Sequence, residues 1–155
     1  MTELATGHPL PHATLAGDDG ERFDLASLKG RKTVLFFYPK ADTSGCTLEA
    51  KDFSRLEPAF KKAGIAVIGV SADPVKAIAK FRAKHGLDVS LATDLDKSLV
   101  ESLGLWVEKS LYGRKYMGIE RTTVLVDAEG VVRRIWPKVK IEGHADEVLA
   151  AAESL

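Results

Sequence analysis

Continuous apolar runs alternate along the chain with stretches in which apolar residues recur every three or four positions. The runs Thr33–Tyr38 and Ile65–Val70 have the length and composition of strands that are buried on both faces of a sheet. Between them lies a helical pattern that extends to Lys62, and we expect Pro58 to interrupt this helix because proline lacks a backbone N–H. A strand, a helix and a second strand in this order favour neighbouring parallel strands.

A second helix is expected directly after the second apolar run. Asp73 is predicted to cap this helix, which covers Pro74–His85 and ends at Gly86. A short strand at Val89–Ala92 and a helix at Lys97–Leu103 continue the alternation.

Turn residues separate two further pairs of short strands, one near each end of the chain. These pairs are Ala13–Ala16 with Glu21–Phe23, and Thr122–Asp127 with Val131–Trp136. A last helix is expected at Asp146–Ser154. The order predicts an α/β protein with a central mixed sheet, as in the thioredoxin fold, plus an N-terminal hairpin extension. No repeat or linker interrupts it, so residues 1–155 are expected to form a single domain.

Composition adds little that is specific. The chain has 155 residues, of which 45% are hydrophobic and 28% charged, as in an ordinary globular protein. Its 22 basic and 22 acidic residues balance, so we expect neither nucleic-acid nor membrane-surface binding. No apolar run approaches the ~20 residues of a membrane span. The N-terminus lacks the basic and apolar regions of a signal peptide, and a cytoplasmic location is expected.

Cys46 is the only cysteine in the sequence. An intramolecular disulfide, a Cys-x-x-Cys redox pair and a cysteine-based zinc site are therefore excluded. His8 and His12 have the spacing of a helical metal pair, but prolines between them make a helix there unfavourable, and no metal is expected. A lone cysteine is most often a small buried hydrophobic residue, which is the alternative to a reactive thiol.

The position of Cys46 favours reactivity, because the segment follows the most apolar strand and enters a helix. Sites in α/β sheets lie beyond the carboxyl ends of such strands. The first turn of a helix stabilises a thiolate, which is the nucleophilic form of cysteine. Gly45 allows close backbone approach, and Thr43 could place its hydroxyl beside the sulfur. The same residues are also good turn and cap residues, so their chemistry alone leaves both interpretations open.

The motif Pro39-x-x-x-Thr43-x-x-Cys46 resembles the active-site motif of peroxiredoxins. The wider sequence is similar to one branch, the bacterioferritin comigratory protein (Q-type) peroxiredoxins, over nearly the whole chain. The segments that carry this resemblance are Phe37–Lys40, Gly45–Ala50, Gly69–Pro74, Glu108–Thr123, Val132–Lys140 and Gly143–Ala145.

The resemblance implies a thiol-dependent peroxidase with a thioredoxin fold. Cys46 would attack the peroxide and become a sulfenic acid, while Arg121 would stabilise the thiolate and the developing charge. Thr43 would orient the peroxide through its hydroxyl, and Pro39 would shield the sulfur from water. Glu49 shares the first turn with Cys46, and its role is left open as that of a supporting residue. Neither a metal nor another cofactor is implied.

The sequence departs from many Q-type members in lacking a second, resolving cysteine. Lys51 and Arg82 occupy the two positions where that cysteine is common. An external thiol, either thioredoxin, glutaredoxin or glutathione, would have to reduce the sulfenic acid, and the relatives suggest a monomer or weak homodimer. Two other functions remain open: a peroxide sensor with little turnover, motivated by the missing cysteine, and a thiol–disulfide oxidoreductase, which the absence of Cys-x-x-Cys disfavours.

Overall fold

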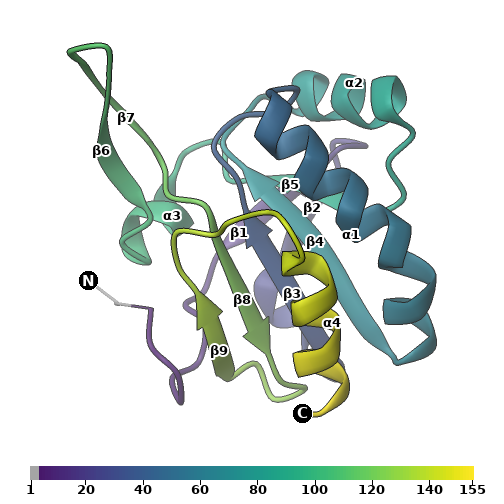
Figure 1. Cartoon of the computed structure of the whole chain (residues 1–155). Coiled ribbons are helices and arrows are strands. Elements are labelled where there is room, and N and C mark those ends of the chain that lie inside the picture. Colours follow the sequence, from purple (N-terminus) through teal and green to yellow (C-terminus); the bar gives the residue numbers. More distant parts are fainter. Residues whose placement is uncertain (1–3) are drawn as a thin grey trace.

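The computed structural model describes residues 4–155, and its centre is a seven-stranded mixed sheet with the strand order β2-β1-β5-β4-β3-β8-β9 (Figure 1). β3, β4 and β5 are parallel, whereas β8, β9, β1 and β2 each pair antiparallel. The arrangement confirms the predicted mixed α/β sheet with an N-terminal hairpin at one edge. The strands are β1 (Thr14–Gly17), β2 (Arg22–Asp24), β3 (Lys32–Phe37), β4 (Ile65–Ser71), β5 (Ser90–Thr93), β8 (Thr122–Val126) and β9 (Val132–Trp136).

Helices cover both faces of the sheet (Figure 1). One face packs against α1 (Ser44–Lys62), α2 (Val75–His85) and α4 (His144–Glu153). The other face packs against the short helices η1 (Leu25–Leu28) and α3 (Ser98–Ser102). Among the described residues, no helix combines the length and apolar character needed to cross a membrane.

β3 supplies side chains to both cores because successive residues of a strand point to opposite faces. Phe36 lies in the core under α1, where its ring stacks on that of Phe53 with centroids 4.5 Å apart. Phe37 lies in the opposite core. A Cβ atom added at Gly69 of the neighbouring strand would lie 2.5 Å from Cζ of Phe36, so only glycine leaves room for this ring.

The predicted break at Pro58 is wrong, because α1 continues through this residue to Lys62. Proline removes one helical hydrogen bond, but the helix is anchored on both sides of it. Phe53, five residues before Pro58, and Phe60, two residues after it, are fully buried, and their burial holds the two halves in line. Ser54 accepts hydrogen bonds at its Oγ from the backbone N–H groups of Asp88 and Val89.

The predicted cap of α2 is also wrong, because Asp73 does not cap this helix. Pro74 is the N-cap residue, and no side chain caps this helix. The carboxylate of Asp73 instead accepts a hydrogen bond of 2.8 Å from the backbone N–H of Ala41, in the loop that follows β3. Gly86 ends the helix in the left-handed conformation, with φ of 60°, as predicted.

A second, two-stranded sheet projects from the body and was not expected from the hydrophobic pattern. It consists of β6 (Trp106–Leu111) and β7 (Arg114–Ile119), which pair only with each other among the described strands (Figure 1). Trp106 and Trp136 are half-buried against the two cores. Tyr116 lies exposed on this hairpin.

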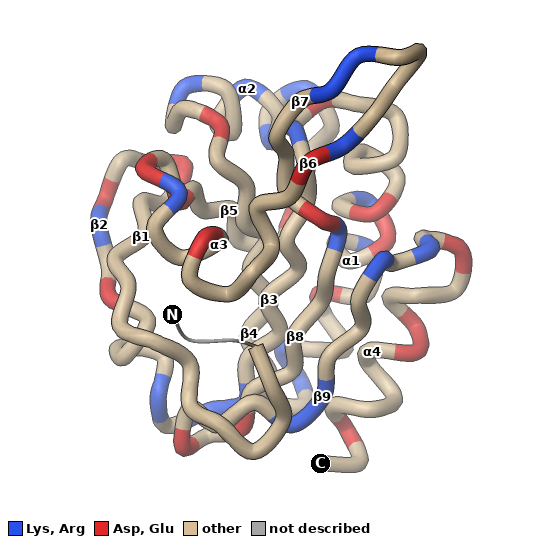
Figure 2. The backbone as a smooth tube through the Cα atoms, turned by 90° about the vertical axis from the view of Figure 1, so that its left-hand side faces the viewer, with Lys and Arg blue, Asp and Glu red and all other residues tan. Residues whose placement is uncertain are grey.

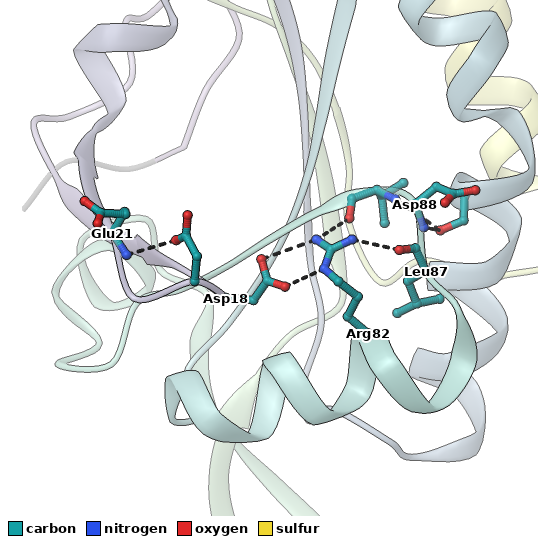
Figure 3. A network of polar contacts seen from close by, with 8 residues as sticks. Asp18, Glu21, Arg82, Leu87 and Asp88 are labelled. Carbon is teal, nitrogen blue, oxygen red and sulfur yellow. Dashed lines mark hydrogen bonds and ion pairs between the residues drawn. The ribbon is translucent and has the colours of Figure 1, made fainter.

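A polar network fastens the end of α2 to neighbouring elements (Figure 3). Arg82 forms an ion pair with Asp18, which lies in the turn after β1. Its guanidinium also donates to the carbonyl oxygens of Leu87 and Val89, at 2.7 and 2.8 Å. Arg82 occupies one of the two positions at which a second cysteine was considered, and its side chain holds three segments together.

Candidate active site

The chain leaves the carboxyl end of β3, crosses a short loop and enters α1, and Cys46 lies in the first turn of this helix. Thr43 is the N-cap residue, so Cys46 is the third residue of the helix. Its residue exposure is only 1%, and it is a free thiol packed in the core under α1. Burial alone would fit an inert cysteine, and the distinction depends on the polar groups beside the sulfur.

Arg121 reaches this sulfur from the start of β8. Its Nη2 atom donates to Sγ of Cys46 at 3.3 Å, and its Nη1 atom donates to Oε1 of Glu49 at 2.7 Å. A Cβ added at Gly45 would lie 3.3 Å from Nη2, so glycine leaves room for the guanidinium. The structure therefore brings together three of the five candidate site residues named from the sequence, which are Cys46, Arg121 and Glu49.

Strand register explains how residues 75 positions apart become neighbours. Phe37, the last residue of β3, pairs with Thr122, the first residue of β8. Arg121 consequently lies beside the point where the chain turns from β3 toward α1. Its carbonyl oxygen accepts a hydrogen bond of 3.0 Å from the N–H of Val139, which fixes the backbone on its other side.

Glu49 is a buried carboxyl group one helical turn after Cys46. Its side chain is 2% exposed, and that of Arg121 is 17% exposed. Desolvation raises the pKa of Glu49 from 4.5 to about 7, although the positive charge of Arg121 acts in the opposite direction. Oε1 is hydrogen-bonded, whereas Oε2 is buried without a partner among the described residues. Glu49 is therefore poised to exchange a proton near neutral pH.

Arg121 remains a cation throughout the working range. Desolvation tends to lower its pKa, but the charges and hydrogen bonds of Glu49 and Cys46 raise it overall. A permanently charged planar donor can hold both partners at once. Negative charge on the sulfur, and on an oxygen bound beside it, is stabilised in this position.

Thr43 and Pro39 precede Cys46 in sequence, and the hydrogen bonds of Thr43 lie within the loop and the start of α1. The hydroxyl of Thr43 donates to the carbonyl oxygen of Lys40 at 2.8 Å, and the structure records no hydrogen bond from it to Cys46. The Thr43 carbonyl accepts from both the N–H and the hydroxyl of Thr47. Pro39 is half-buried at the start of the loop.

Two aspartates that the sequence did not mark as site residues hold this loop. Asp73 anchors it through the N–H of Ala41. Asp42 has a positive φ of 63°, and its carboxylate contacts Lys84 and His85 of α2 at 2.8 and 2.7 Å. Hydrogen bonds from these two side chains lower the pKa of Asp42. Aspartate tolerates a positive φ better than most residues do, so Asp42 before Thr-Ser-Gly was the sequence signal for this loop conformation.

Lys109 of β6 is a second cation on which the charge of Cys46 acts, and sequence reasoning missed it. It is half-buried, and its aliphatic chain lies over Gly118 of β7. Desolvation and the charge of Arg121 lower its pKa, while Cys46 and Glu120 act in the opposite direction. Within residues 4–155, no three histidine, cysteine or acidic side chains gather as a metal site would require, and His8 and His12 are exposed.

This geometry suits nucleophilic chemistry at sulfur. The first turn of α1 directs N–H groups and the positive end of the helix dipole toward Cys46. Arg121 adds a fixed cation, and burial keeps these interactions strong by excluding water. An electrophile with a leaving oxygen would find the thiolate and the donors for the developing charge on one side of the sheet.

Comparisons with known proteins agree with this chemistry. Residues 6–135 match the model of the AhpC/TSA family. A putative peroxiredoxin Bcp of Coxiella burnetii is 47% identical over 146 residues, which cover 94% of this chain and 97% of the relative.

Solved structures are similar over almost the full length. A structure of Xanthomonas campestris bacterioferritin comigratory protein, determined in connection with its alkyl peroxide reduction activity, has a TM-score of 0.88 and 40% identity, and the match covers 97% of this chain and 98% of that one. Mutants of the Xanthomonas campestris peroxiredoxin Q were solved with serine replacing cysteine at two positions 36 residues apart. In this chain, Arg82 lies 36 residues after Cys46, and there is no second cysteine. The chain therefore belongs to the AhpC/TSA family and, within it, to the bacterioferritin comigratory protein (Q-type) peroxiredoxins, as a member without a resolving cysteine.

Proposed function

We propose that the chain reduces hydrogen peroxide and organic hydroperoxides, with Cys46 as the nucleophile. The observation that carries this proposal is the hydrogen bond of 3.3 Å from the Arg121 guanidinium to the sulfur of the only cysteine, at the first turn of a helix. Family membership supports the reaction class.

In the first step, the Cys46 thiolate attacks the terminal oxygen of R–O–O–H. An S–O bond forms as the O–O bond breaks, which gives Cys–S–OH and RO⁻, and RO⁻ then takes up a proton to become water or alcohol. Arg121 stabilises the thiolate and the charge that grows on the leaving oxygen. Glu49 holds Arg121 in place through its hydrogen bond of 2.7 Å.

Thr43 and Pro39 keep the roles that the family resemblance implies, as parts of the proposal. The hydroxyl of Thr43 would exchange its bond to Lys40 for one to the bound peroxide, after a rotation about one side-chain bond. Pro39 would limit the access of water to the sulfur. Replacing Thr43 by valine therefore tests the hydroxyl without changing the side-chain shape.

An external thiol completes the cycle because the chain has no second cysteine. One thiol R′SH condenses with the sulfenic acid to give a mixed disulfide and water. A second thiol then releases Cys46 and forms R′S–SR′. Thioredoxin, glutaredoxin and glutathione are the candidate reductants, and a monomer or weak homodimer suffices for the chemistry. A cytoplasmic location fits a thiol that has to be returned to its reduced form.

Stopped-flow measurement of peroxide consumption tests the proposal. The protein is expected to react rapidly with micromolar peroxide and to turn over when thiol is added, whereas Cys46→Ser is expected to be inactive. Full activity of Cys46→Ser would refute the role of the thiol. Rapid oxidation without turnover by any reductant would favour the peroxide sensor, which the relatives named as peroxiredoxins disfavour. A negative insulin-reduction assay is expected if the chain is not a thiol–disulfide oxidoreductase.

A further inference from the structure

The β6–β7 hairpin presents one face that is continuous with the active site. Side chains of directly paired residues in antiparallel strands lie on the same face. The pairs Val107–Gly118, Lys109–Tyr116 and Leu111–Arg114 therefore form one face, and the alternate pairs form the other. β7 ends at Ile119, two residues before Arg121, and the N–H of Glu120 donates to the carbonyl oxygen of Leu105 at 2.8 Å, so the base of the hairpin adjoins the active site. The charges of Arg121 and Cys46 act on Lys109, which agrees with placing the Lys109 face toward the site.

This face is cationic and apolar. Beyond the half-buried Lys109, it carries the exposed side chains of Leu111, Arg114 and Tyr116. At the tip, Tyr112 is 96% exposed and has a φ of 51°, and Gly113 follows with 78°. Such a two-residue turn is tight, so these large side chains are presented on a short, ordered hairpin. The opposite face includes Glu108, which contacts Lys115 at 3.8 Å, whereas the active-site face carries no acidic residue.

The hairpin projects past the end of the main sheet near which α1 begins (Figure 1). Both of its strands have an unpaired edge among the described strands. Basic positions outnumber acidic ones on the projecting part, as Figure 2 shows. Exposed aromatic residues and arginine gathered on one element are typical of protein-binding surfaces.

We propose that this face docks a protein thiol reductant whose own surface is acidic and apolar around its reactive cysteine. The inference rests on the proposed function, since the sulfenic acid requires a thiol from another molecule. Cys46 is almost fully buried, so a protein thiol has to be aligned closely before its sulfur can attack. A surface that adjoins the site and complements the partner's charge provides this alignment.

The alternate faces of the hairpin supply a matched test. The variant Arg114→Glu/Tyr116→Ser changes the proposed docking face, and Lys115→Glu/Met117→Ser makes the same charge and apolar changes on the other face. Three rates are measured for each: oxidation of Cys46 by hydrogen peroxide, reduction of the sulfenic acid by dithiothreitol, and reduction by thioredoxin or glutaredoxin. Circular dichroism melting checks that each variant is folded.

The docking-face variant is expected to lose at least about tenfold in kcat/KM for the protein reductant, a loss on the scale of a few interface residues. Its peroxide and dithiothreitol rates are expected to stay within about twofold, as are all three rates of the opposite-face variant. The wild-type rate with the protein reductant should also fall with added salt, and less so after Arg114→Glu.

Equal losses in both variants, or no loss in either, would overturn the docking proposal. It would also be overturned if the wild type turns over with dithiothreitol but with neither protein reductant. A change of oligomeric state in ultracentrifugation, without a change in reductant kinetics, would assign the face to a second copy instead. Failure of the proposed function is distinguishable, because Cys46 of the wild type would then not react with peroxide at all.

Discussion

At the scale of residues, the site depends on one guanidinium that serves two acidic groups. Arg121 donates to Cys46 through one nitrogen and to Glu49 through another. The Cys46 thiolate and the Glu49 carboxylate therefore compete for the same positive charge. Whether Glu49 is neutral or ionised changes how much of that charge the sulfur receives.

Replacing Arg121 is expected to slow the peroxide step strongly. Arg121→Met removes the donor to the sulfur and the leaving oxygen, and we expect a decrease of about 100-fold in the rate of Cys46 oxidation. Arg121→Lys keeps a charge but loses the forked geometry, and its rate should lie between the two. Stopped-flow oxidation by hydrogen peroxide measures both. Arg134→Met, which changes an exposed arginine of β9, is the control and should be without effect.

The burial of Glu49 predicts a pH dependence of folding stability. Its pKa is 4.5 in the unfolded chain and about 7 in the folded protein, so the folded state binds the proton more tightly. The free energy of unfolding therefore falls as pH rises from about 4.5 to about 7, and the loss, about 3 kcal/mol, is complete above that range. Urea denaturation at about pH 5 and pH 8 should show this difference in the wild type and a much smaller one in Glu49→Gln. Equal differences between the two pH values in the wild type and in Glu49→Gln would show that Glu49 is not the source of the pH dependence.

The sequence predicts these site residues to different extents. Cys46 and Arg121 follow from the motif and the resemblance, and the structure brings them into contact. The bond between the Thr43 hydroxyl and Lys40, and the anchoring of the loop by Asp73, could not be read from the sequence. A side chain with several possible partners chooses among them by tertiary distance, and local residue preferences contain no such information.

At the scale of elements, the long apolar runs were predictable and the short polar strands were not. β3 and β4 are buried on both faces, so their sequences are largely apolar. β6 and β7 belong to a hairpin that is largely exposed, and hydrophobic patterning has no buried face to reveal there. The error at Pro58 has the opposite origin, because buried aromatic residues on α1 outweigh a local preference.

The anchoring of α2 by Arg82 predicts a clear stability effect. Arg82→Met leaves the carboxylate of Asp18 and two carbonyl oxygens without their donor. We expect a loss of about 2 kcal/mol in the free energy of unfolding, as for hydrogen bonds from a partly buried charged group. The matched control is Arg55→Met, which removes the exposed pair with Asp146 and should cost less than about 1 kcal/mol. Similar losses in both variants by urea denaturation would show that the network adds nothing beyond an ordinary surface pair.

At the scale of the whole molecule, one thiol and one buried site determine the products of oxidation. A single cysteine excludes an intramolecular disulfide, and Cys46 is only 1% exposed, which disfavours a bridge between two copies. One equivalent of hydrogen peroxide should therefore add a single oxygen atom to the intact mass of the monomer. Subsequent glutathione should replace that product with a mixed disulfide and then restore the original mass, and Cys46→Ser should not change under either treatment. A disulfide-linked dimer as the main product would contradict the burial of Cys46. Two buried sulfur atoms can meet only if the first turn of α1 opens.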